Sequence, residues 1–154
     1  RAYADGADLE ARGYMLAAAS MGSTAFQKGL GGIHSLSHSI GALYSTHHGL
    51  TNAVFFPYVM DFNRSAIEEK MSRVSAYLGF KNLGYDAVRD WILETRDFYS
   101  IPHSISEMDI DDSDIDRIGV LSAADPTASS NPIELNEVAA RQVFLKSLEG
   151  KIDF

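Results

Sequence analysis

Apolar residues recur every three or four positions along most of the chain, which is the spacing of an amphipathic α-helix. Ile33, Leu36, Ile40 and Leu43 follow this spacing, and no segment alternates apolar and polar residues as a half-buried strand does. The pattern therefore predicts an all-α fold of about seven helices in a single domain covering residues 1–154. The expected helices span residues 9–26, 33–44, 52–62, 65–78 and 85–98, followed by a short helix around 115–121 and a last helix before Gly150.

Capping signals mark several of these helix boundaries. Asp8 and Asn136 each precede a helical stretch and are predicted N-caps. The run from Ser65 to Glu68 has the form of a capping box and predicts a helix that begins there. Pro57 lacks a backbone N–H, so we expect it in the first turn of the buried helix 52–62.

The amphipathic pattern of residues 85–98 predicts which side chains reach the core. We expect an inward face and an outward, solvated face on this helix. The inward face comprises Val88, Trp91, Ile92 and Thr95, and the outward face comprises Arg89, Asp90 and Glu94.

Composition and charge exclude several classes of protein. The 154 residues contain no cysteine, which excludes a disulfide scaffold, an iron–sulfur site and a thiol nucleophile. The net charge of −8 argues against nucleic acid or an anionic membrane as a partner. No apolar run is long enough to predict a transmembrane helix. The chain begins without Met or a signal peptide, and we expect a piece of a larger cytoplasmic protein.

Acidic residues are concentrated between Glu107 and Asp116. A calcium loop starting at Asp109 would need Gly at its sixth position and Glu at its twelfth, and Asp114 and Val120 stand there instead. The run is typical of a solvated helix N-terminus, where acidic side chains complement the helix dipole. Asp112 or Ser113 is the expected cap.

Four of the five histidines lie within fifteen positions, at 34, 38, 47 and 48. His34 and His38 are four residues apart on a predicted helix and share a face, so two imidazoles there can bind one divalent metal. His48 precedes Gly49, where the chain can turn back toward that helix. Spacing alone leaves open whether these histidines form a metal site or are ordinary polar surface residues. His103 is expected to be a loop residue.

The stretch from Gly29 to Val54, with His34, His38 and His48-Gly49 in fixed spacing, resembles the signature of the iron-containing (group III) alcohol dehydrogenases. The continuation 56–63, the Ile101-Pro102 segment and the loop 125–132 are also similar, so the resemblance covers nearly the whole chain. It corresponds to the C-terminal helical domain of the dehydroquinate synthase-like fold. Glycerol dehydrogenase and dehydroquinate synthase are less well matched members of that superfamily.

The resemblance implies a divalent metal, Fe²⁺ or Zn²⁺, held by one Asp and three His. Two of these ligands match His34 and His48, and the other two have no match in this chain. His38 matches a histidine that faces the substrate and the nicotinamide, so it is the expected catalytic residue. Phe26 and Thr127 are expected to line the substrate pocket, and His47 to lie behind the ligands or at the surface.

The implied activity is the NAD(P)-dependent oxidation of an alcohol, or reduction of an aldehyde or ketone, by a homo-oligomer. NAD(P) would be bound by an N-terminal α/β domain that this chain lacks, so we expect the chain by itself to be inactive and to bind metal weakly. The alternative is a free-standing helical module that binds a metal or a partner protein and catalyses nothing.

Overall fold

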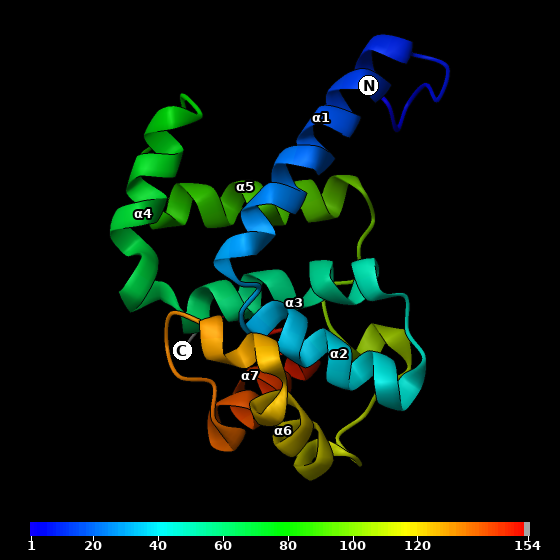
Figure 1. Cartoon of the computed structure of the whole chain (residues 1–154), viewed down its shortest axis with the longest axis vertical. Helices are drawn as coiled ribbons and strands as arrows, with labels where there is room; N and C mark the ends of the chain where they lie inside the picture. The colour runs from blue at the N-terminus through cyan, green and yellow to red at the C-terminus, as the bar shows by residue number, and fades with distance from the viewer. Residues whose placement is uncertain (153–154) are drawn as a thin grey trace.

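A computed structural model describes residues 1–152 and shows, within that range, helices joined by loops and no strand (Figure 1). The all-α prediction is therefore confirmed for the described residues. The α-helices are α1 (Leu9–Ala25), α2 (Gly32–Tyr44), α3 (His48–Phe62), α4 (Arg64–Tyr77), α5 (Tyr85–Phe98), α6 (Ile115–Ala124) and α7 (Glu137–Glu149). Short 3₁₀ helices are η1 (Phe26–Lys28), η2 (Ser106–Met108) and η3 (Pro126–Ser130).

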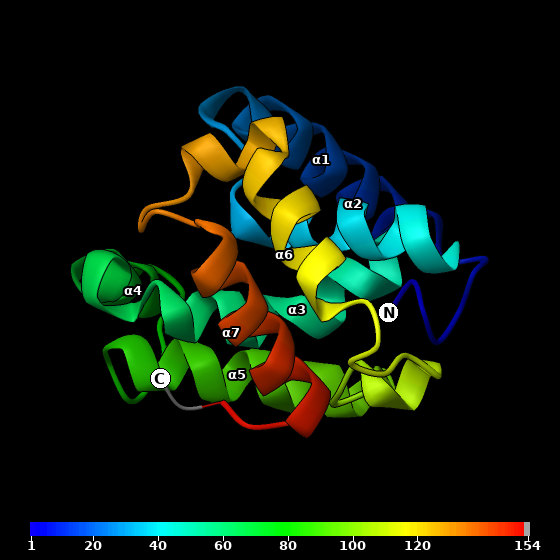
Figure 2. The same cartoon turned by 90° about the horizontal axis from the view of Figure 1, so that it is seen from below.

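Helix α3 lies at the centre of the molecule, between α5 on one side and α2, α6 and α7 on the other (Figures 1 and 2). Apolar side chains from α2, α3, α6 and α7 form one core cluster, and α3 and α5 contribute to a second, smaller one. The fully buried members of the main cluster include Leu36, Ile40, Phe55, Tyr58, Ile118 and Phe144. Burial of this apolar surface is the main term that stabilises the helix arrangement.

Three buried serines bring α2 and α6 close together. Ser35 Oγ donates to the Ser122 carbonyl at 2.6 Å, and Ser122 Oγ donates to Ser39 Oγ at 2.9 Å. Each hydroxyl is thus satisfied inside the core, as a buried polar group must be. The packing fixes one face of α2 inward and leaves the face that carries His34 and His38 directed away from the core.

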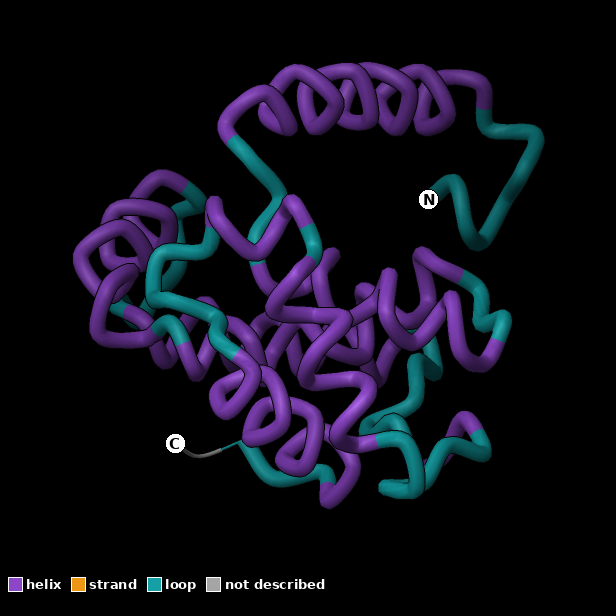
Figure 3. Tube along the Cα trace, turned by 60° about the horizontal axis from the view of Figure 1, so that its bottom comes forward, coloured by secondary structure: helices purple, strands orange, loops and turns teal. Residues whose placement is uncertain are grey.

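Helix α1 runs apart from the other helices (Figure 3). Its one buried residue is Ala11, and its large apolar side chains face solvent in the described structure. The exposed apolar residues of α1 are Leu9, Tyr14, Met15, Leu16 and Met21. So many exposed large apolar side chains on a single helix are unusual for a free surface.

Two predicted caps and one predicted stop are confirmed. Asp8 accepts a hydrogen bond from the Ala11 N–H at 2.9 Å, and Asn136 accepts one from the Ala139 N–H at 3.0 Å. Gly150 ends α7 in the left-handed conformation at φ 71°.

The capping box at Ser65 is wrong, because α4 already begins at Arg64 and Asn63 holds the N-cap position. Asn63 makes no side-chain cap either. Its amide is paired instead with the amide of Asn131, through Asn63 Nδ2 to Asn131 Oδ1 at 2.9 Å and Asn131 Nδ2 to Asn63 Oδ1 at 2.8 Å. A contact with a distant residue therefore takes the place of a side-chain cap on the first turn of α4.

The predicted start of the buried helix 52–62 is also wrong. Helix α3 begins at His48, and the His47 ring caps it by accepting the Leu50 N–H at Nδ1 over 3.1 Å. Pro57 therefore lies in the helix interior rather than in the first turn. It is fully buried, and packing against the core outweighs the backbone hydrogen bond that proline cannot make.

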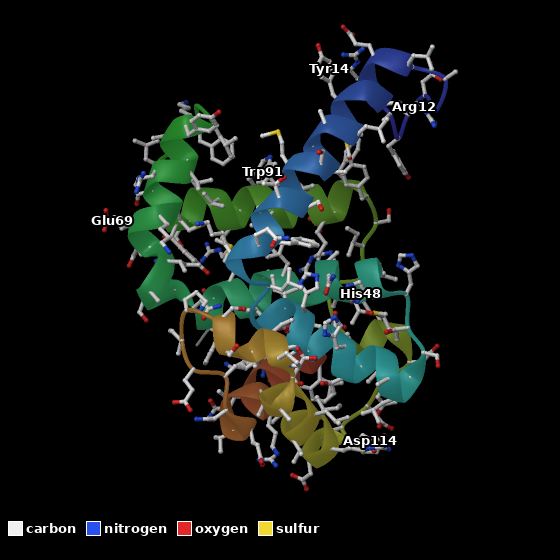
Figure 4. All side chains as sticks on the ribbon, in the orientation of Figure 1. Arg12, Tyr14, His48, Glu69, Trp91 and Asp114 are labelled. Atoms are coloured by element: carbon white, nitrogen blue, oxygen red, sulfur yellow. The ribbon has the colours of Figure 1, made fainter. Side chains whose placement is uncertain are left out.

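On α5, the inward face is shifted from the prediction. Trp91 is 47% exposed and projects from α5 (Figure 4), whereas Arg96 is buried and donates to the His103 carbonyl at 3.2 Å. On α6, neither Asp112 nor Ser113 is the cap, because Asp114 occupies that position without a side-chain bond. No helix among the described residues is both long enough and apolar enough to cross a membrane.

Candidate functional site

Three histidine rings meet where α2 and α3 pack together, close to the start of α3, where Figure 4 labels His48. The ring centroids of His34 and His48 are 5.2 Å apart, those of His38 and His48 are 5.3 Å apart, and those of His34 and His38 are 5.8 Å apart. The structure thus gathers the histidines that the spacing singled out. Ser45, in the left-handed conformation at φ 55°, ends α2 and lets the chain turn back.

The Nε2 atoms of His34 and His48 point at the same neighbour, the side-chain amide of Asn52. Asn52 Nδ2 lies 3.3 Å from His34 Nε2 and 3.0 Å from His48 Nε2. Since the amide nitrogen is a donor, both ring nitrogens accept, and their lone pairs converge on one small region. Sequence reasoning missed Asn52, although its position four residues after His48 on a helix places it on the same face.

Burial and neighbouring charge keep His34 neutral. Desolvation lowers the pKa of the His34 imidazole below its ordinary value, and repulsion from His48 and His38 lowers it further, while Asp125 acts weakly in the opposite direction. A metal ligand must be deprotonated at the nitrogen that binds. His34 therefore has the protonation state that coordination requires.

Two buried polar atoms in this region have no hydrogen-bond partner, His34 Nδ1 and Asn52 Oδ1. Buried polar atoms are normally paired, so these point to interactions that the described residues do not make. The donor set fits a divalent metal in part, because two neutral imidazoles suit Fe²⁺ or Zn²⁺. No group of three His, Cys, Asp or Glu side chains within residues 1–152 is arranged to hold a metal.

His38 belongs to the same cluster but has a different partner. Its Nδ1 lies 2.9 Å from Asp125 Oδ2, and its ring stacks on that of His48 at an interplanar angle of 14°. Its side chain is 41% exposed, so the ring remains accessible from outside. Asp125 is a functional candidate that sequence reasoning missed, because it lies 87 residues from His38.

The expected pocket residues lie beside this cluster. The Phe26 ring contacts the His34 ring edge-on at a centroid distance of 5.7 Å and is 54% exposed. Thr127 donates both its backbone N–H and its hydroxyl to Asp125, at 2.8 and 2.5 Å. Both residues therefore flank the histidines, Phe26 directly and Thr127 through Asp125.

The remaining two histidines lie outside the cluster. His47 is exposed at the start of α3, where it acts as the helix cap. His103 is in the loop after α5, as expected, and its Nε2 pairs with Asp97 Oδ1 at 2.7 Å.

Comparison with known proteins finds a matching family model and similar sequences. Residues 1–148 match the family model described as "Fe-containing alcohol dehydrogenase family, C-terminal". The chain is 33% identical over 139 residues to the NAD-dependent methanol dehydrogenase of Bacillus methanolicus, which covers 86% of this chain and 36% of that protein. It is 31% identical to the 4-hydroxybutyrate dehydrogenase of Cupriavidus necator, over 96% of this chain and 41% of that protein.

Solved structures agree with the sequence comparison. The crystal structure of a 1,3-propanediol oxidoreductase matches with a TM-score of 0.88 at 29% identity, over 96% of this chain and 40% of that one. The alcohol dehydrogenase from Oenococcus oeni matches with a TM-score of 0.84 at 27% identity, over 95% of this chain and 40% of that one. In each comparison the chain spans well under half the length of the protein it matches.

Proposed function

The chain belongs to the Fe-containing alcohol dehydrogenase family, and we propose that it is the metal-binding part of an NAD(P)-dependent enzyme that oxidises an alcohol or reduces an aldehyde or ketone. The observation that carries this proposal is the convergence of His34 Nε2 and His48 Nε2 on one point. The relatives named above support it, since one is a methanol dehydrogenase and another a 4-hydroxybutyrate dehydrogenase.

In this proposal His34 and His48 provide two nitrogen ligands for Fe²⁺ or Zn²⁺. The bound metal supplies Lewis-acid chemistry at an alcohol or carbonyl oxygen. For both nitrogens to face the metal, the Asn52 amide must turn away from them, and its unpaired Oδ1 is available for a new donor. Burial of His34 favours the neutral imidazole, which is the form that binds.

His38 is the proposed catalytic residue of the same site. It is accessible, and its ring lies next to that of His48 without sharing the Asn52 amide. This position suits a group that holds or moves a proton beside the reacting oxygen. We propose that Phe26 and Thr127 border the substrate, with the Phe26 ring as the apolar wall next to His34.

The remaining parts of the enzyme are proposed to come from outside this chain. An N-terminal α/β domain would bind NAD(P), and an Asp and a His would complete the ligand set. The exposed apolar side chains of α1 support this proposal, because a second domain seated there would bury them. We propose that the whole enzyme is a cytoplasmic homo-oligomer, since NAD(P) is available inside the cell.

Titration of the 154-residue chain with zinc, measured by isothermal titration calorimetry, tests the metal site. We expect weak binding that His34→Ala and His48→Ala each abolish, because two ligands are too few for either to be dispensable. His103→Gln is the matched control, since His103 is an accessible histidine outside the cluster, and we expect it to bind zinc as the unaltered chain does. Binding that survives both cluster substitutions would refute the proposal.

A further inference from the structure

The pairing of His38 with Asp125 joins α2 to η3 across 87 residues of sequence. The Asp125 side chain is 15% exposed, whereas that of His38 is 41% exposed. The carboxylate is thus the sheltered partner and the imidazole the accessible one. A hydrogen bond from Nδ1 to a fixed carboxylate gives the accessible His38 ring a defined orientation.

Thr127 holds the Asp125 carboxylate in one orientation. Its backbone N–H and its hydroxyl both donate to Asp125 Oδ1, so Oδ2 is the oxygen that faces His38. Burial raises the pKa of the Asp125 carboxyl, but the hydrogen bonds from Thr127 and His38 outweigh that effect, and the pKa lies below its ordinary value. Asp125 is therefore ionised at neutral pH and acts only as an acceptor.

An acceptor at Oδ2 decides which nitrogen of His38 carries the proton. In a neutral imidazole one nitrogen donates and the other accepts, and the nitrogen that faces a carboxylate must be the donor. Nδ1 faces Asp125, so Nδ1 carries the hydrogen and Nε2 keeps its lone pair. No hydrogen bond between His38 Nε2 and another described residue competes with this assignment.

We propose that Asp125, held by Thr127, is a positioning residue that keeps His38 in the Nδ1–H tautomer and so presents a bare Nε2 to the hydroxyl of the substrate. The use of that nitrogen in catalysis rests on the proposed function. The tautomer itself does not, since it follows from the hydrogen bonds of the chain alone.

The substitution Asp125→Asn tests this with almost no change in shape. Both donors of Thr127 remain, so they retain the amide oxygen of the new side chain, and its NH₂ group must then face His38 Nδ1. A donor in that place forces Nδ1 to accept, and the proton moves to Nε2. The opposite amide orientation would place NH₂ against the Thr127 backbone N–H, which can only donate, and is excluded for that reason.

Long-range ¹H–¹⁵N NMR of the ¹⁵N-labelled 154-residue chain, at a pH where its histidines are neutral and with metal removed by chelator, distinguishes the protonated ring nitrogen from the bare one. We expect the Nδ1–H pattern for His38 in the unaltered chain and the inverted, Nε2–H pattern in Asp125→Asn. Asp97→Asn is the matched control, because Asp97 pairs with a different histidine, His103, and it should leave the His38 signals unchanged.

Two results would overturn the proposal. One is an Nε2–H pattern for His38 in the unaltered chain, which needs no variant and so does not depend on how Asp125→Asn folds. The other is an unchanged Nδ1–H pattern in an Asp125→Asn chain whose circular dichroism shows an intact fold. Neither measurement involves metal, NAD(P) or substrate, so failure here is distinguishable from failure of the proposed function.

Discussion

The side chain of Asn131 joins distant segments of the chain near the site. It accepts from the Gly32 N–H at 3.0 Å, pairs with the Asn63 amide in both directions, and donates to the Ile133 carbonyl at 2.7 Å. Gly32 begins α2 and Asn63 precedes α4, so one amide fixes both helices to the loop after η3.

We predict that Asn131→Ala lowers the free energy of unfolding by about 3 kcal/mol, because several hydrogen bonds are lost and the buried Asn63 Nδ2 loses its partner. Urea unfolding followed by circular dichroism measures this. Ser129→Ala is the control, since Ser129 is exposed and donates only to the nearby Pro126 carbonyl; its effect should stay within about 0.5 kcal/mol. Equal effects of the two substitutions would contradict the prediction.

The lowered pKa of His34 gives a second prediction at this scale. The pKa lies below the ordinary value of 6.5 because of burial first and of His48 and His38 second. The unfolded chain then takes up this proton at a higher pH than the folded chain, so stability falls as the pH falls through 6.5.

His34→Gln removes this contribution. With metal removed by chelator, we expect the unfolding free energy of the variant to fall less than that of the unaltered chain between about pH 7 and about pH 5. Urea unfolding across that pH range makes the comparison. The same pH slope in both chains would show that His34 is not held neutral by its surroundings.

At the scale of the element, α1 is the helix with the least tertiary support. It buries only Ala11, whereas α3 buries eight residues, from Thr51 to Asp61. A helix that lacks packing opens without the rest of the fold. We predict that the backbone amides of α1 exchange with deuterium far faster than those of α3 in the isolated chain, as measured by hydrogen-exchange mass spectrometry at low concentration.

Protection of α1 equal to that of α3 would contradict this prediction. It would show that α1 is covered in solution. Dilution would then distinguish coverage by a second copy of the chain from contacts of α1 within its own chain. A copy dissociates on dilution, and protection would fall with it.

At the scale of the whole molecule, the described chain brings two imidazoles to one point and no third ligand. We predict that the 154-residue chain, with Fe²⁺ or Zn²⁺ added, shows no NAD(P)-dependent oxidation of an alcohol, because two imidazoles are an incomplete ligand set and the domain proposed to align the nicotinamide is absent from the assay. Absorbance of NAD(P)H reports the reaction. The full-length 1,3-propanediol dehydrogenase of Citrobacter freundii, 28% identical over 151 residues, serves as the positive control. Turnover by the chain alone would show that it holds a complete active site.

Local signals in the sequence determined much of the helical content. The N-caps at Asp8 and Asn136 and the stop at Gly150 act within one turn of the residues concerned, so the amino-acid pattern alone predicts them. The helix period placed His34 and His38 on one face, but the pairing of His34 with His48 came from the resemblance to the family motif and not from spacing alone.

Contacts between distant segments of the chain decided the features of the fold and the site that the sequence pattern did not predict. Asn63 holds the N-cap position of α4 without capping it, because Asn131, 68 residues away, offers its amide two hydrogen bonds. Pro57 is tolerated inside α3 because the surrounding core buries it completely. His38 meets Asp125 only after α2 and η3 have packed together. Periodicity and capping describe interactions within a few residues, and these three outcomes depend on the free energy of burial and on partners that only the folded chain brings into reach.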